Sequence, residues 1–285
     1  MFIDFRVNPA FFEDIHVDEE HLNKRHNGFY LYNNSLAKLQ HINNQMNLAG
    51  LDKLVIMAED RRTEFERPLV SNEEIKKLVD ISNGKFIGFA SVDPLYENAV
   101  EIVSEAFEKL NLSGLRLNLS IAHIYPSDER VSKLLDVCEK YKKPVVFDCG
   151  FAWEKESVSK YTRPIEFEEL LYKRQNIKIC LTQFGWPYMK EVAMLMLKYR
   201  NLYTDTGLLY FDNASEFYKR LFNDDIPITW IDRSLRHQIM FASGNPRFEQ
   251  IRMANAIKEI GLRESTLELI QGKNAIEFLG GTLWL

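Results

Sequence analysis

The sequence lacks long hydrophobic runs and an excess of positive charge, and it contains few cysteines. No apolar stretch approaches the roughly 18 residues that a membrane-spanning helix needs. The formal net charge of −5 argues against a protein that binds nucleic acid electrostatically. The first residues show no basic segment followed by an apolar one, so export is not expected. We therefore expect a cytoplasmic protein with neither membrane nor nucleic-acid partners.

The three cysteines, Cys138, Cys149 and Cys180, follow neither a CxxC nor a metal-finger spacing. Their odd number fits a reducing compartment. We expect all three to be buried thiols. Cys149 should point outward toward the helices, which argues against a role as nucleophile.

The chain also lacks a glycine-rich phosphate loop after its first strand, which disfavours a dinucleotide-binding fold. Short apolar strands alternate with helix-length segments, a rhythm typical of parallel βαβ units. Eight such units in 285 residues predict a single (β/α)8 TIM-barrel domain over residues 1–285. The expected strands are residues 2–8, 53–58, 86–92, 114–119, 144–149, 177–182, 202–206 and 238–243.

The first expected strand alternates polar and apolar side chains, which predicts two different faces. The polar face should reach a site at the carboxyl end of the barrel, where barrel enzymes carry their catalytic groups. Phe2, Asp4, Arg6 and Asn8 are expected on this face, and Ile3, Phe5 and Val7 on the other.

A long connection, residues 10–50, follows this strand. Its second half, residues 35–46, has apolar residues at helical spacing and should form the first barrel helix. Its aromatic and charged first half, residues 10–34, is expected to form a lid insertion over the site. The lid contains His16, His21 and His26, which suggest either a replacement metal site or, because no ligand spacing recurs, a solvated loop.

Motifs at several strand ends together resemble the amidohydrolase-2 branch of the amidohydrolase superfamily. That branch includes aminocarboxymuconate-semialdehyde and dihydroxybenzoate decarboxylases, and lactonases. The resemblance runs over nearly the whole chain and implies a TIM barrel with its site at the carboxyl ends of the strands. The motifs include Ile3-Asp4-Phe5, Ser91-Val92-Asp93-Pro94, Gly114-Leu115-Arg116-Leu117, Phe184-Gly185-Trp186-Pro187 and Phe241-Ala242-Ser243-Gly244-Asn245-Pro246.

The same resemblance implies that the family's metal ligands are replaced in this chain. The strand-1 histidine pair corresponds to Arg6 and Asn8, and the strand-5 and strand-6 histidines to Asp148 and Gln183. The strand-8 aspartate corresponds to Gly244. Arginine has no lone pair to give a metal, so we expect no metal and no cofactor.

The resemblance places a different polar set at the site. We expect Asp148, Arg6 and Arg116 as catalytic residues, the two arginines to bind the anionic substrate and Asp148 to act as general base or acid. Asp148 and Asp4 are the expected counter-charges of the two arginines. Asp205 lies nearby, but the pattern leaves its facing open. The expected substrate-binding residues are Asn8, Asn118, Gln183, His123, Trp186, Asn245 and Arg247.

Two functions remain open for this set. The first is a metal-independent hydrolase, or a lyase such as a decarboxylase, that acts on a small anionic, carboxylate-bearing substrate. The second is an inactive pseudoenzyme that binds a small anion or a protein partner, with the polar groups forming a salt-bridged plug. An open cavity at the carboxyl ends of the strands would favour the enzyme. Both functions are compatible with a homodimer.

Overall fold

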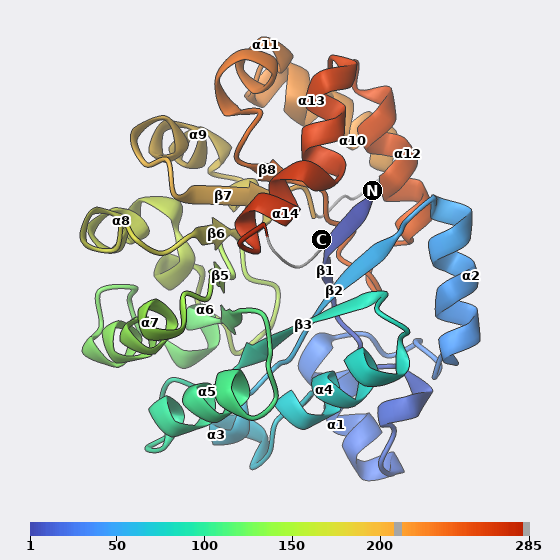
Figure 1. Ribbon diagram of the computed structural model, residues 1–285, viewed down its shortest axis with the longest axis vertical. Helices are drawn as coiled ribbons and strands as arrows, with labels where there is room; N and C mark the ends of the chain where they lie inside the picture. Colours follow the sequence, from blue (N-terminus) through green and yellow to red (C-terminus); the bar gives the residue numbers. More distant parts are fainter. Residues whose placement is uncertain (208–212, 282–285) are drawn as a thin grey trace.

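The computed structural model describes residues 1–207 and 213–281, which form a barrel of parallel strands surrounded by helices (Figure 1). The strands follow one another around the sheet in chain order, and each pairs in parallel with the next. They are β1 Ile3–Val7, β2 Lys53–Met57, β3 Phe86–Ser91, β4 Leu115–Leu117, β5 Val145–Phe147, β6 Ile179–Leu181, β7 Leu202–Asp205 and β8 Ile239–Met240.

Backbone hydrogen bonds between β1 and the segment after β8 complete the circle. Phe5 N donates to Phe241 O at 2.8 Å, and Gly244 N donates to Arg6 O at 3.3 Å. The predicted (β/α)8 barrel is thereby confirmed. Its α-helices are α1 Glu19–Phe29, α2 Leu39–Ala49, α3 Arg62–Phe65, α4 Asn72–Ile81, α5 Ala99–Glu108, α6 Leu119–Ala122, α7 Glu129–Tyr141, α8 Glu168–Lys173, α9 Met189–Lys198, α10 Ala214–Arg220, α11 Ile228–Trp230, α12 Gln250–Glu259, α13 Glu264–Glu268 and α14 Asn274–Phe278.

Apolar side chains fill the barrel interior, including Ile3, Val55 and Phe89. Helix α14 lies across the end of the barrel where the strands begin (Figure 1). Its Phe278 ring packs edge-on against Phe5 at 5.2 Å and against Tyr203 at 5.1 Å between ring centroids. Side chains of α14 and the strands therefore close the barrel interior at this end.

The two faces of β1 differ from the simple alternation that the sequence predicts. The pairing of β1 with β2 shifts between Asp4 and Val7, where three residue steps on β1 match two on β2. Such a β-bulge re-aims the side chains that follow it. Phe2 and Val7 therefore belong to the outer core, whereas Ile3 and Phe5 face the interior.

The expectation that Asp4 shares a face with Arg6 is wrong for this reason. Asp4 is fully buried on the helix side, where it accepts hydrogen bonds from Ser243 N at 2.8 Å and Gln250 Nε2 at 3.0 Å. Burial raises the pKa of Asp4 to about 6, although these hydrogen bonds lower it. Asp4 is thus not a counter-charge of Arg6.

The segment expected as a lid, residues 10–34, forms a 3-10 turn at Glu13–Ile15 and helix α1. Arg25 of α1 is buried and anchors the segment through Glu74 Oε1 at 2.7 Å and Leu69 O at 2.7 Å. His21 is buried as well, with Nε2 3.2 Å from Pro68 O. The segment is therefore packed against the barrel wall and is not solvated throughout.

The structure also bears on two smaller expectations. Cys138, Cys149 and Cys180 are free and buried, as predicted. Among the residues described, no helix combines the length and the apolar character that a membrane crossing requires.

Candidate functional site

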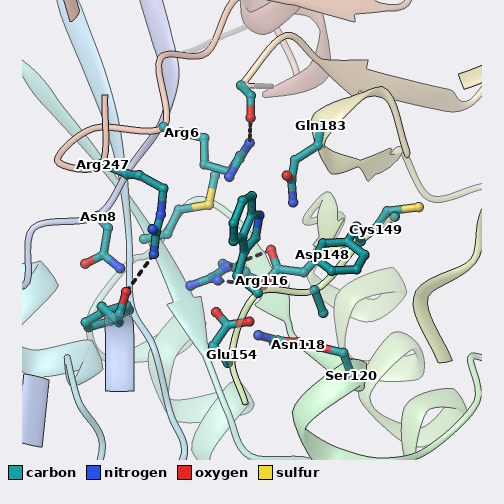
Figure 2. Close-up of a pocket in the computed structure, with 18 of the residues that line it drawn as sticks. Arg6, Asn8, Arg116, Asn118, Ser120, Asp148, Cys149, Glu154, Gln183 and Arg247 are labelled. Carbon is teal, nitrogen blue, oxygen red and sulfur yellow. Dashed lines mark hydrogen bonds and ion pairs between the residues drawn. The ribbon is translucent and has the colours of Figure 1, made fainter. Parts of the chain in front are cut away.

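A cavity opens at the carboxyl ends of the strands, with a volume of about 900 Å³, its mouth included. Its wall is built from the ends of β1, β4, β5 and β6, from the loops that follow them and from the loops after β7 and β8. Eight of the predicted site residues lie in this wall, and Figure 2 shows most of them. They are Arg6, Asn8, Arg116, Asn118, Asp148, Gln183, Asn245 and Arg247.

Arg6 forms a two-point ion pair with Asp205, which lies fully buried at the end of β7. Arg6 Nε is 2.9 Å from Asp205 Oδ2, and Nη2 is 3.1 Å from Oδ1. Nη2 also donates to Gly207 O at 2.8 Å. Burial lowers the pKa of Arg6, but the Asp205 carboxylate outweighs this effect and leaves the pKa above its usual value. Asp205, whose facing the sequence left open, is therefore the counter-charge of Arg6.

Arg116 is held by two carboxylates. Its Nε and Nη2 lie 3.2 and 2.6 Å from the two carboxylate oxygens of Asp148, the partner that the sequence predicts. Its Nη1 bonds Glu59 Oε2 and, at 3.3 Å, Ala58 O. Burial raises the pKa of Glu59 to about 7, while Arg116 lowers it. Sequence reasoning missed Glu59, although an acid two residues beyond a buried strand was an available signal.

Two further charged residues face the cavity without forming an ion pair. Arg247 donates from Nη2 to Phe29 O at 2.7 Å, and its guanidinium carbon lies 5.7 Å from the centre of the Trp153 ring. Burial lowers the pKa of Arg247. Glu154, which sequence reasoning also missed, lines the same cavity. Within the described ranges, no ion pair or side-chain hydrogen bond engages the carboxylate of Glu154, and no carboxylate pairs with Arg247.

Several side-chain amides complete the wall. Asn8 Oδ1 accepts from Ala10 N at 3.0 Å, and Asn118 Oδ1 accepts from Ser120 Oγ at 2.7 Å. Gln183 adopts a positive φ of 59°, and its side chain points into the cavity (Figure 2). Gln183 N donates to Asp205 Oδ1 at 3.0 Å, which fixes the backbone at this point. The amide groups of these side chains can therefore donate hydrogen bonds to a ligand.

Two predicted substrate-binding residues lie outside this wall. His123 is exposed, with Nε2 2.7 Å from Glu156 O, and it lines a neighbouring hollow. The Trp186 ring packs against Phe151 and Phe217, with centroids 6.4 and 6.2 Å away. The structure thus does not bring His123 or Trp186 to the cavity.

The donor atoms in the cavity do not fit a divalent transition metal. Such an ion needs several imidazole, thiolate or carboxylate donors that converge on one point. Arg6 and Arg116 offer no lone pair, and both oxygens of Asp148 accept hydrogen bonds from Arg116. In the part of the chain that the structure describes, no group of three or more His, Cys, Asp or Glu side chains could hold a metal.

Comparisons with known proteins support the fold. The family model described as Amidohydrolase matches residues 21–281. A search of the curated proteins gave no match. An uncharacterised TIM-barrel protein from Bordetella bronchiseptica is 17% identical, with a TM-score of 0.77 and 98% of each chain covered.

Two further solved structures with a similar fold are named after an enzymatic activity. The 5-carboxyvanillate decarboxylase of Sphingomonas paucimobilis is 13% identical, with a TM-score of 0.67 and 98% of each chain covered. A probable 2-pyrone-4,6-dicarboxylic acid hydrolase from Acinetobacter baumannii, solved with citric acid bound, is 15% identical, with a TM-score of 0.64. The match covers 98% of this chain and 99% of that one. At these identities the likeness shows a shared fold.

Proposed function

Because the chain belongs to the amidohydrolase family, we propose that its cavity is the active site of an enzyme that hydrolyses or decarboxylates a small carboxylate-bearing substrate without a metal ion. Two structures with the same fold are named for a decarboxylation and for the hydrolysis of a dicarboxylic acid. The donor set in the cavity supports a mechanism that uses this chain's own side chains.

One observation carries the proposal: Arg247 and the Arg116–Asp148 pair face the same open cavity. Arg247 has a guanidinium that no carboxylate of the described chain neutralises, and it can form a charge-assisted hydrogen bond to a substrate carboxylate. The sequence predicts that Arg6 and Arg116 bind the anionic group of the substrate. Their ion pairs support a different role for them, which is to position Asp205 and Asp148.

Asp148 is the group best placed for proton transfer. The two-point contact with Arg116 fixes the orientation of its carboxylate, and both carboxylate oxygens accept hydrogen bonds from Arg116. An ionised carboxylate can accept a proton from an attacking water molecule but cannot donate one. Hydrolysis of an ester, lactone or amide is therefore better supported than decarboxylation, in which a proton must be delivered to carbon.

The second candidate is a protein that binds a small anion without turning it over. The ion pairs favour this candidate, since Arg116 already occupies both carboxylate oxygens of Asp148. The open cavity argues against the salt-bridged plug, because a plug would leave no space above the paired side chains.

A ligand screen followed by a turnover assay separates these candidates. Small carboxylates should raise the melting temperature of the parent protein, since a ligand that binds only the folded state stabilises it. Arg247→Met should abolish this shift, and Arg252→Met, a change at an exposed arginine of α12, should leave it intact. Asp148→Asn should keep the shift and lower hydrolysis of carboxylate-bearing esters, lactones or amides by about 10²–10⁴-fold. Binding without turnover by the parent protein would favour the non-catalytic candidate, and no binding by any carboxylate would reject both.

A further inference from the structure

The cavity presents charges of both signs that have no ion-pair partner. Arg247 lies in the loop after β8, and Glu154 lies in the loop after β5. Figure 2 shows the two side chains on different parts of the wall, with the guanidinium of Arg247 apart from the carboxylate of Glu154. Burial lowers the pKa of Arg247, and the carboxylate of Glu154 raises it. The two charges therefore interact electrostatically. They are nevertheless too far apart to form an ion pair.

The other charges around the cavity largely cancel. Arg6 and Asp205 form a neutral pair on one side. On the other side, Arg116 pairs with Asp148 and with Glu59, whose pKa lies at about 7, and the carboxylate of Glu154 also raises the pKa of Arg116. With Glu59 protonated, the Arg116 cluster is neutral; with Glu59 ionised, it adds a negative charge on the side of Glu154. The cavity wall is therefore positively charged at Arg247 and negatively charged at Glu154.

From this arrangement we infer that the cavity binds a zwitterion, a small molecule that carries an ammonium or similar cationic group in addition to its carboxylate. The inference rests on the proposed function, in which Arg247 takes the carboxylate. The cationic group then faces the carboxylate of Glu154.

The chemistry favours this class over a dianion or a plain carboxylate. A second negative group opposite Arg247 would face Glu154 and be repelled. A plain carboxylate would leave the Glu154 carboxylate partly desolvated under the bound ligand without compensation. A zwitterion satisfies both charges at once. Phe151, Trp153 and Phe248 line the cavity and can pack against the carbon skeleton of such a ligand.

Matched pairs of ligands that differ only in one ammonium group test the inference by calorimetric titration. Suitable pairs are alanine and propionate, phenylalanine and 3-phenylpropionate, and 4-(aminomethyl)benzoate and 4-methylbenzoate. We expect the ammonium group to tighten binding at least about tenfold in the pair that fits the cavity best. Glu154→Gln should reduce this gain to less than about twofold and leave the plain carboxylate bound at least as tightly as in the parent protein. Glu166→Gln, a change at an exposed glutamate away from the cavity, should preserve the gain.

The outcomes distinguish this inference from the proposed function. If the plain carboxylates bind and the ammonium group brings no gain, or if Glu154→Gln preserves the gain, the zwitterion site is refuted and the carboxylate site stands. If no member of any pair binds the parent protein, both are rejected. Loss of binding for both members of the best pair in Arg247→Met, with the gain removed by Glu154→Gln, supports both.

Discussion

Asp4 and Arg6, separated by one residue on β1, lie on opposite sides of the barrel wall. Asp4 accepts a hydrogen bond from Gln250 of α12 at 3.0 Å, whereas Arg6 binds Asp205 above the barrel interior at 2.9 Å. The β-bulge in β1 separates them. The charge of Arg6 is neutralised by Asp205 of β7, and the cavity retains Arg247 and Glu154 as charges without an ion pair among the described residues.

This pairing predicts a large loss of stability in Arg6→Met. The change leaves the fully buried Asp205 carboxylate without its cation, which typically costs about 3–5 kcal/mol. Urea unfolding followed by circular dichroism measures the free energy of unfolding. Arg130→Met is the control, because the Arg130–Asp128 pair is largely exposed and should contribute less than about 1 kcal/mol. A loss of similar size in both variants would show that Asp205 does not depend on Arg6.

The raised pKa of Glu59 predicts that its contribution to stability falls as the pH rises. The pKa is about 7 in the folded protein and 4.5 for the ordinary side chain. Its stabilising contribution is complete below about pH 4.5 and is lost as the pH rises through 7. Asp4, with a pKa of about 6, also makes the free energy of unfolding fall as the pH rises, over a lower pH range. The lowered pKa of His21 makes the free energy of unfolding rise with pH.

Glu59→Gln isolates this contribution. We expect the difference in unfolding free energy between the variant and the parent to change by a few kcal/mol between pH 5 and pH 8, in favour of the variant at high pH. Denaturant unfolding at four pH values gives this difference. A constant difference across the range would mean that Glu59 does not titrate there. Glu166→Gln serves as the exposed control.

The donor set predicts that the protein carries no stoichiometric transition metal. Protein purified without chelator should contain well below one atom of zinc, manganese or iron per chain, because Arg6 and Arg116 offer no lone pair and both Asp148 oxygens accept hydrogen bonds from Arg116. Elemental analysis by mass spectrometry is the measurement. One equivalent of metal that disappears in Asp148→Ala would show that the ligand set was misidentified.

The segment expected as a lid gives a kinetic prediction. Tyr30 Oη donates to Glu156 Oε2 at 2.8 Å and accepts from Lys155 N at 3.1 Å, so it joins residues 29–32 to the loop after β5. Phe29 and Leu31, on either side of Tyr30, line the cavity. We expect Tyr30→Phe to raise both the association and dissociation rates of a bound carboxylate several-fold with little change in Kd. Stopped-flow tryptophan fluorescence would measure both rates, and unchanged rates would argue against a lid.

Strand periodicity and helix-length spacing were enough to predict the barrel, because each βα unit buries a local pattern of apolar residues. The resemblance to the family predicts Asn118, Asp148 and Gln183 at one site, and all three line the cavity, since the carboxyl ends of parallel strands meet at one end of a barrel. These features depend on residues close in sequence and on a general rule of the fold.

The partners of the charged groups were decided only by the tertiary structure. The facing of Asp4 depends on a bulge that exists through pairing with β2, and Arg6 meets an aspartate 199 residues away. Glu59 and Glu154 acquire their importance from burial and from the distance to Arg116 or Arg247. Electrostatic energies depend on separation and solvent exposure in three dimensions. The sequence by itself therefore determined where the site lies, while the folded chain determined which of its charges are left for a ligand.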